Sequence, residues 1–141
     1  MSLNVKNNII NNKIKGVSSM NNARIKARLD RYVDKICGSY LHLYSLEQQG
    51  ERANKTEIIN ALEELGGVFN SEYADMIFDL TKANHRNSRE ILYVGSLFHS
   101  FAGNKEMAIR YYNGLADYYK QLGKKLEYQK YIDIIKKLQA E

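Results

Sequence analysis

The residues of this chain best suited to metal binding or nucleophilic chemistry are three histidines and one cysteine, and they are scattered. His42, His85 and His99 fall in separate segments, without cysteine or carboxylate neighbours at the short spacings of metal sites. Cys37 falls one residue from an apolar stripe, where a packing role is more common than a nucleophilic one. Gly66-Gly67 lacks the lysine and further glycines of a phosphate-binding loop. We therefore predict a protein that is not an enzyme and that holds no metal and no cofactor.

Tyrosine is the most unusual feature of the composition, at 11 of 141 residues. Tyr111-Tyr112 and Tyr118-Tyr119 fall on one expected helix, and packing between long helices is the simpler explanation for them. The alternative is that some tyrosines face outward and stack on nucleic-acid bases or line a peptide groove. On that alternative we predict partner contacts from Tyr93, Arg110 and Tyr118.

The positive charge of the chain is concentrated at its N-terminal end. Residues 1–35 carry eight basic and two acidic side chains, whereas residues 36–141 carry 13 basic and 14 acidic ones. Such a basic segment attracts a phosphate backbone, an anionic lipid or an acidic protein, although a solvated face without a partner is the commoner outcome. The basic residues predicted as partner contacts are Lys13, Lys15, Arg24, Lys26, Arg28 and Arg31.

Length and composition predict one all-α domain. A chain of 141 residues without proline is free to form long helices, and its apolar fraction of 44% can fill a single core. The single cysteine favours a reducing compartment, and residues 1–20 lack the apolar core of a secretory signal. The longest uncharged run, residues 91–104, is shorter than the roughly 20 residues that cross a bilayer. We expect a cytoplasmic protein without a membrane span.

Apolar spacing predicts about six antiparallel helices, in a helical bundle or a helical repeat. Residues 1–20 form an asparagine- and lysine-rich arm that we expect to be flexible, and residues 21–141 form the helical domain. The first helix is expected over residues 22–48, loosened at Gly38, and the second to start at Asn54 and stop at Gly66-Gly67. The remaining helices are expected to start near Ser71, Ser88, Asn104 and after Gly123.

The stretch from Leu92 to Leu115 resembles a tetratricopeptide repeat, and the resemblance extends over about residues 88–139. Gly103-Asn104 matches the turn of that motif, Ser96 and Ala108 its small positions, and Tyr112 its second-helix aromatic. The resemblance implies two antiparallel helices that approach closely through small residues. Some repeats of this family bind peptide carboxylates through Lys and Asn of the first helix, but Tyr93 and Leu97 stand at those positions here.

These patterns together favour a non-catalytic protein-interaction module, such as an adaptor, a chaperone or a regulatory subunit, that uses a helical groove. A protein or peptide is the expected partner, and self-association into a homo-oligomer is left open. The alternative is a nucleic-acid-binding regulator that contacts phosphates through its N-terminal arm and first helix.

Overall fold

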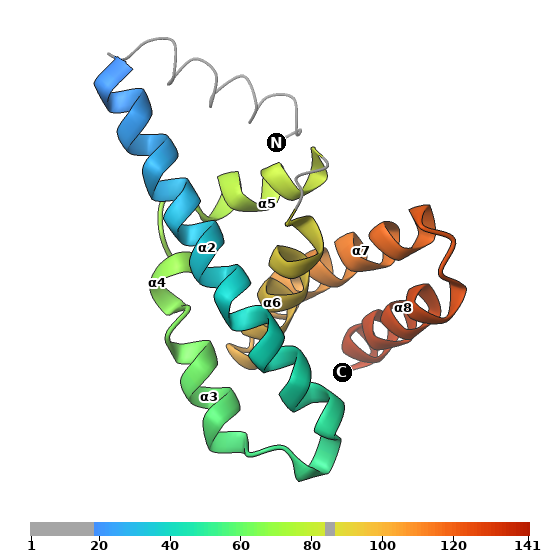
Figure 1. Cartoon of the computed structure of the whole chain (residues 1–141). Coiled ribbons are helices and arrows are strands. Elements are labelled where there is room, and N and C mark those ends of the chain that lie inside the picture. Colours follow the sequence, from blue (N-terminus) through green and yellow to red (C-terminus); the bar gives the residue numbers. More distant parts are fainter. Residues whose placement is uncertain (1–18, 84–86) are drawn as a thin grey trace.

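The computed structural model describes residues 19–83 and 87–141, and all regular elements within these two ranges are helices (Figure 1). The all-α prediction is therefore confirmed. The order along the chain is α2 (Ser19–Gln49), the 3-10 helix η1 (Gly50–Arg52), α3 (Lys55–Glu63), α4 (Gly66–Phe69), α5 (Ala74–Lys82), α6 (Ser88–Phe101), α7 (Lys105–Gln121) and α8 (Lys125–Ala140). Within the described ranges there are seven α-helices, where the sequence predicted six.

The longest element is α2, whose 31 residues cross the whole molecule (Figure 1). Its buried residues recur every three or four positions, the spacing that places side chains on one side of a helix. Gly38 does not interrupt the helix, contrary to the expected loosening, and the chain turns only at Gly50, where φ is 60°. The buried residues on this side are Val33, Ile36, Tyr40, Leu43 and Leu46.

The expected cap at Asn54 is present. The Asn54 side-chain oxygen accepts hydrogen bonds from the backbone amides of Thr56 and Glu57, at 3.0 and 3.4 Å. These amides have no partner within the first turn of α3, so the asparagine satisfies them and starts the helix.

The prediction that Gly66-Gly67 ends a helix in the left-handed conformation is wrong. Neither glycine has a positive φ, and both belong to the short helix α4. Leu65, Val68 and Phe69 are all buried, and another helical turn keeps these three side chains in the core. The next helix begins at Ala74, because the Ser71 hydroxyl accepts a hydrogen bond from the Tyr73 amide at 3.2 Å and holds a turn before it.

The last three helices form a stack in which α7 packs on both α6 and α8, and α7 and α8 run antiparallel (Figure 1). Gly103 and Gly123 occupy the two turns with φ values of 77° and 72°, a left-handed conformation that glycine adopts without strain. Asn104 caps α7 by accepting a hydrogen bond from the Met107 amide at 3.3 Å. The sequence predicted both turns correctly.

Small residues let α6 and α7 approach each other closely. A Cβ atom on Gly95 would collide with the Tyr111 ring, and a Cβ on Gly114 would lie 2.6 Å from Leu92 Cδ2. Ser96 and Ala108, the two small positions of the predicted hairpin, are both fully buried. The two helices therefore pack through positions without bulky side chains.

One hydrophobic core joins the N-terminal and C-terminal helices. α2 packs across α6, with α3 and α4 beside one flank of α2 and α8 towards the other (Figure 1). Fully buried side chains of this core come from α2, α5, α6 and α7, namely Ile36, Leu43, Ile77, Phe78, Ile91, Tyr111 and Leu115. Within the described ranges, none of the helices has the length and hydropathy needed to cross a membrane.

Candidate partner-binding site

The predicted basic contacts fall partly on α2 and partly outside the described residues. Lys13 and Lys15 lie outside them. Arg24, Arg28 and Arg31 are exposed and follow one another at spacings of four and three residues, which places them along one side of the helix with Lys35. We call these four residues the basic row; it extends about 16 Å along the helix axis. Lys26 is also exposed, but its position in the helical repeat places it on a different side of α2.

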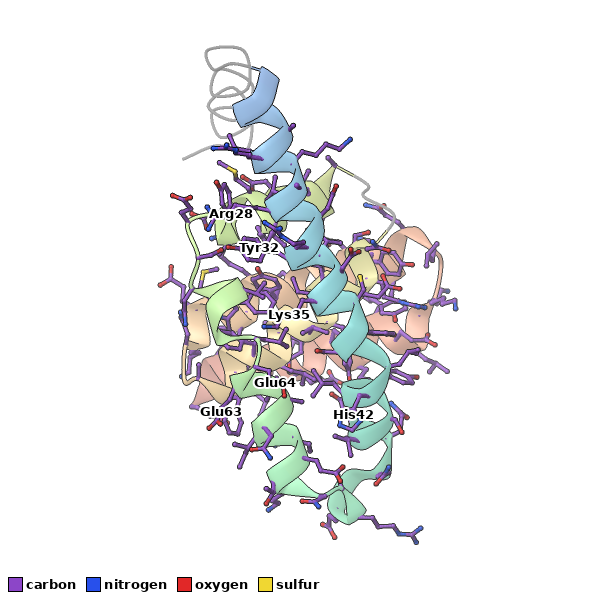
Figure 2. The ribbon with its side chains drawn as sticks, turned by 60° about the vertical axis from the view of Figure 1, so that its left-hand side comes forward. Arg28, Tyr32, Lys35, His42, Glu63 and Glu64 are labelled. Carbon is purple, nitrogen blue, oxygen red and sulfur yellow. The ribbon has the colours of Figure 1, made fainter. Side chains whose placement is uncertain are left out.

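The basic row lies beside acidic groups. Figure 2 shows Arg28 and Lys35 on α2, with Glu63 at the end of α3 and Glu64 just after it on the side of Lys35. Arg28 Nη1 lies 3.9 Å from Glu72 Oε1, and the Arg28 guanidinium lies 5.5 Å from the centre of the Tyr73 ring.

Asp30 and Asp34 are also exposed on α2, but their positions in the helical repeat place them on a different side of the helix from the basic row. Because Glu72 pairs with Arg28, the row presents its cations in a surface of mixed charge rather than a uniformly positive one.

A group of tyrosines fills the space where α2 meets α6, α7 and α8. On the α2 side, Tyr93 of α6 packs edge-on against Tyr40 at 5.3 Å and lies 5.8 Å from Tyr44. On the other side, Tyr131 of α8 stacks on Tyr119 at 5.7 Å with an interplanar angle of 9°. We call this group the tyrosine cluster; its members are Tyr40, Tyr44, Tyr93, Tyr112, Tyr118, Tyr119 and Tyr131.

Tyr93, which the sequence analysis named as a partner contact, is buried. Only 3% of Tyr93 is exposed, because α2 covers it, and its hydroxyl donates a 2.7 Å hydrogen bond to Glu47 Oε2. Burial raises the pKa of Tyr93 far above its usual value of 10, and the neighbouring Glu47 carboxylate raises it further. Glu47 Oε1 also lies 3.6 Å from the Lys130 ammonium of α8. Tyr93 is therefore the buried end of a polar link that joins α2, α6 and α8.

Other cluster tyrosines also have raised pKa values. Burial is the main cause at Tyr131, and the neighbouring Tyr119 adds to it. Burial likewise raises the pKa of Tyr119 to about 12. These hydroxyls therefore stay protonated at neutral pH.

The exposed edge of the tyrosine cluster lies on α2 and at the start of α6. Leu41 is 73% exposed and Tyr44 is 42% exposed, and the two residues lie one helical turn apart. The guanidinium of Arg89 on α6 lies 5.2 Å from the centre of the Tyr40 ring, and Tyr40 in turn packs on Tyr44. We call Leu41, Tyr44 and Arg89 the Leu41 patch. Sequence analysis missed Leu41 and Arg89, and only the packing of α2 on α6 places the Arg89 guanidinium over the Tyr40 ring.

Arg110 does not extend freely into solvent, as an outward-facing partner contact would. It is half-buried, and its guanidinium lies 4.6 Å from the centre of the Phe78 ring, with Nη1 3.6 Å from the Met107 sulfur. This stacking fixes the side chain against the core between α5 and α7.

Tyr118 is half-buried and packs against Tyr119 at 5.1 Å. It also lines an open hollow of about 250 Å³ between α5, α6 and α7. The hollow is lined by Thr81, Lys82, Ser88, Leu92, Gly114, Asp117, Tyr118 and Gln121.

The residues suited to metal binding or nucleophilic chemistry remain apart. His42 is exposed on α2 (Figure 2), whereas His99 is buried against the rings of Phe69, Phe98 and Tyr111. Burial lowers the pKa of His99, so its ring stays neutral. His85 lies outside the described residues. Among the described residues, no group of three histidine, cysteine, aspartate or glutamate side chains is placed to bind a metal ion.

No protein-family model, curated protein or solved structure matches this chain. The tetratricopeptide resemblance of residues 88–139 therefore stays a prediction from the sequence.

Proposed function

We propose that this chain is a non-catalytic protein-interaction module that binds another protein through the Leu41 patch. The observation that carries this proposal is the exposure of Leu41 and Tyr44, at 73% and 42%, on α2 near Tyr40, whose ring holds the Arg89 guanidinium. Tyrosine and arginine are enriched among the residues that dominate binding energy, and an apolar neighbour adds area that can be removed from water.

The surroundings of the patch suit an interface. Behind Tyr44 lie the buried rings of Tyr40 and Tyr93, so the contacting side chain rests on a fixed support. A surface that is already ordered loses less conformational entropy on binding than a mobile one.

Partly exposed charges of Glu47 and Lys130 continue the surface towards α8, where they would form a polar rim. The stack of α6, α7 and α8, whose sequence resembles a helical repeat, would serve as the scaffold. With its single cysteine, such a module fits a reducing compartment, and we propose that it acts in the cytoplasm.

Site-specific photo-crosslinking in an extract of the source organism tests the proposal. A photoreactive phenylalanine analogue at Leu41 should crosslink to a discrete protein, and the same analogue at Phe101, which is 53% exposed, should not. The Leu41 crosslink should disappear when Arg89→Gln is added. A second copy of this chain is among the proteins that such a crosslink can identify. Equal crosslinking from both positions would contradict the proposal.

The basic row favours a second candidate, a nucleic-acid-binding regulator. Arg24, Arg31 and Lys35 are exposed on one side of α2, so they could contact successive phosphates. Glu72 beside the row opposes such a polyanion. Titration with DNA and RNA at two salt concentrations separates the candidates, since phosphate contacts weaken steeply with salt. Absence of binding at low salt would remove this candidate.

A further inference from the structure

The turn between α7 and α8 forms a tip at one edge of the molecule (Figure 1). Lys120, Lys124 and Lys125 lie within about one helical turn of Gly123, at the centre of this tip. All three lysines are exposed, and together they line an open hollow of about 410 Å³ with Gly123, Tyr128 and Gln129. The lining thus combines three cations with one aromatic ring.

One cation of the hollow is held in place. The Lys120 ammonium lies 5.9 Å from the centre of the Tyr128 ring, and the two side chains come from different helices. The nearest acidic residues along the chain are Asp117 on α7 and Glu127 on α8, and neither lines the hollow. The hollow therefore suits an anionic group such as a phosphate.

The same tip exposes large apolar side chains. Leu126 is 86% exposed, more than any other large hydrophobic residue described, and Leu122 is 54% exposed. These leucines flank the turn, with Lys124 and Lys125 between them in sequence. Protruding leucines among lysines are the arrangement that peripheral proteins use at the boundary between lipid headgroups and acyl chains.

We propose that this tip docks on anionic phospholipid membranes. Lys120, Lys124 and Lys125 attract the headgroup phosphates, while Leu122 and Leu126 enter the boundary with the acyl chains. A membrane is a better fit than an acidic protein, because the two exposed leucines beside the lysines match the apolar boundary below the headgroups, whereas an acidic surface would engage the lysines alone. The proposal is independent of the Leu41 patch, which lies on α2.

Vesicle co-sedimentation of the full chain tests this proposal. The chain should bind vesicles of phosphatidylcholine mixed with phosphatidylglycerol, bind pure phosphatidylcholine much more weakly, and detach as salt is raised. Each lysine near an anionic surface contributes about fivefold in affinity, so the K120Q/K124Q/K125Q variant should lose roughly 100-fold. The L122S/L126S variant should lose about tenfold or more.

Matched variants separate the tip from general charge and apolar exposure. K55Q/K136Q/K137Q makes the same change of charge at exposed lysines elsewhere, and F101S removes another exposed apolar group. Both controls should bind anionic vesicles within about twofold of the wild type, since surface changes far from the contact leave binding energy unchanged. Thermal unfolding followed by circular dichroism shows that each variant is folded.

Three results would overturn the proposal. One is the absence of binding to anionic vesicles at low salt. Another is an equal loss of binding in the tip and control lysine variants, which would mean that charge acts without a particular site. The third is unchanged binding of L122S/L126S together with complete competition by soluble polyglutamate, which would assign the lysines to acidic proteins instead.

Discussion

The N-terminal helices and the C-terminal stack use glycine in opposite ways. In the stack, Gly95 faces the Tyr111 ring and Gly114 faces Leu92, so each is required by a neighbouring helix. In the N-terminal half, a Cβ on Gly38, Gly66 or Gly67 would meet no described atom within 4 Å. Helices α6 and α7 are thus fitted to each other closely, whereas α2 lies across them and keeps one side exposed.

The largest effect that we expect comes from alkaline pH, because the two halves meet at the tyrosine cluster. The pKa of Tyr93 and of Tyr131 is raised in the folded state, so their neutral forms stabilise the fold fully below the unfolded pKa of about 10. That contribution is lost as the pH rises above about 10, towards the folded pKa values. Helix content and tyrosinate absorbance should therefore change together in one cooperative transition.

Titration of most tyrosines near pH 10 with helix content intact would show that the cluster is open to solvent. Such a result would also mean that the N-terminal helices and the C-terminal stack lack a shared buried interface.

The next largest effect is expected for Gly95→Ala. The added methyl group collides with the Tyr111 ring, and overpacking a core costs about 1–3 kcal/mol of unfolding free energy. The matched change Gly38→Ala, in an exposed part of α2, should instead stabilise the protein by about 0.5–1 kcal/mol. Urea unfolding of both variants measures the difference. The same sign for both changes would remove the contrast between the two regions.

A comparable or smaller effect is expected from breaking the hydrogen bond that the Tyr93 hydroxyl donates to Glu47 of α2. Glu47→Leu leaves that hydroxyl without its buried acceptor, which costs about 1–3 kcal/mol. In the double variant with Tyr93→Phe most of this cost should be recovered, because both polar partners are then absent. A double-mutant cycle on urea unfolding gives the coupling energy. A coupling energy near zero would mean that the two halves are joined by apolar contacts alone.

The smallest effect belongs to the N-terminal half alone. Asn54→Ala removes the side-chain acceptor for two amides of α3 and should cost about 1 kcal/mol. Asn54→Asp should retain most of the stability, since aspartate caps helices equally well. Thermal unfolding measures both, and an unchanged midpoint for Asn54→Ala would show that α3 is held by packing alone.

Local signals in the sequence were sufficient for the helices whose ends depend on neighbouring residues. Asn54 caps α3, and Gly103 closes the turn before α7, as predicted. Gly66-Gly67 misled the prediction because burial of Val68 and Phe69, a property of the whole core, keeps that segment helical.

The candidate site was predictable only in part, for the same reason. The concentration of positive charge in the sequence singled out Arg24, Arg28 and Arg31 of the basic row, but it also included Lys26, which lies on a different side of α2. Spacing within α6 could not show that α2 covers Tyr93, nor that the Arg89 guanidinium lies over the Tyr40 ring at the edge of the tyrosine cluster. Residues that depend on contacts between helices far apart in sequence thus escaped the prediction.

The most direct test of the proposed function uses the protein identified by photo-crosslinking at position Leu41. Titration calorimetry measures the affinity of this chain for that protein. Tyr44→Ala should weaken binding by about 30-fold or more, as at a residue that dominates an interface. Arg31→Gln/Lys35→Gln, which changes two exposed residues of the basic row, should weaken it less than about threefold. The reverse order, with the basic row dominant and Tyr44 neutral, would contradict binding through the Leu41 patch.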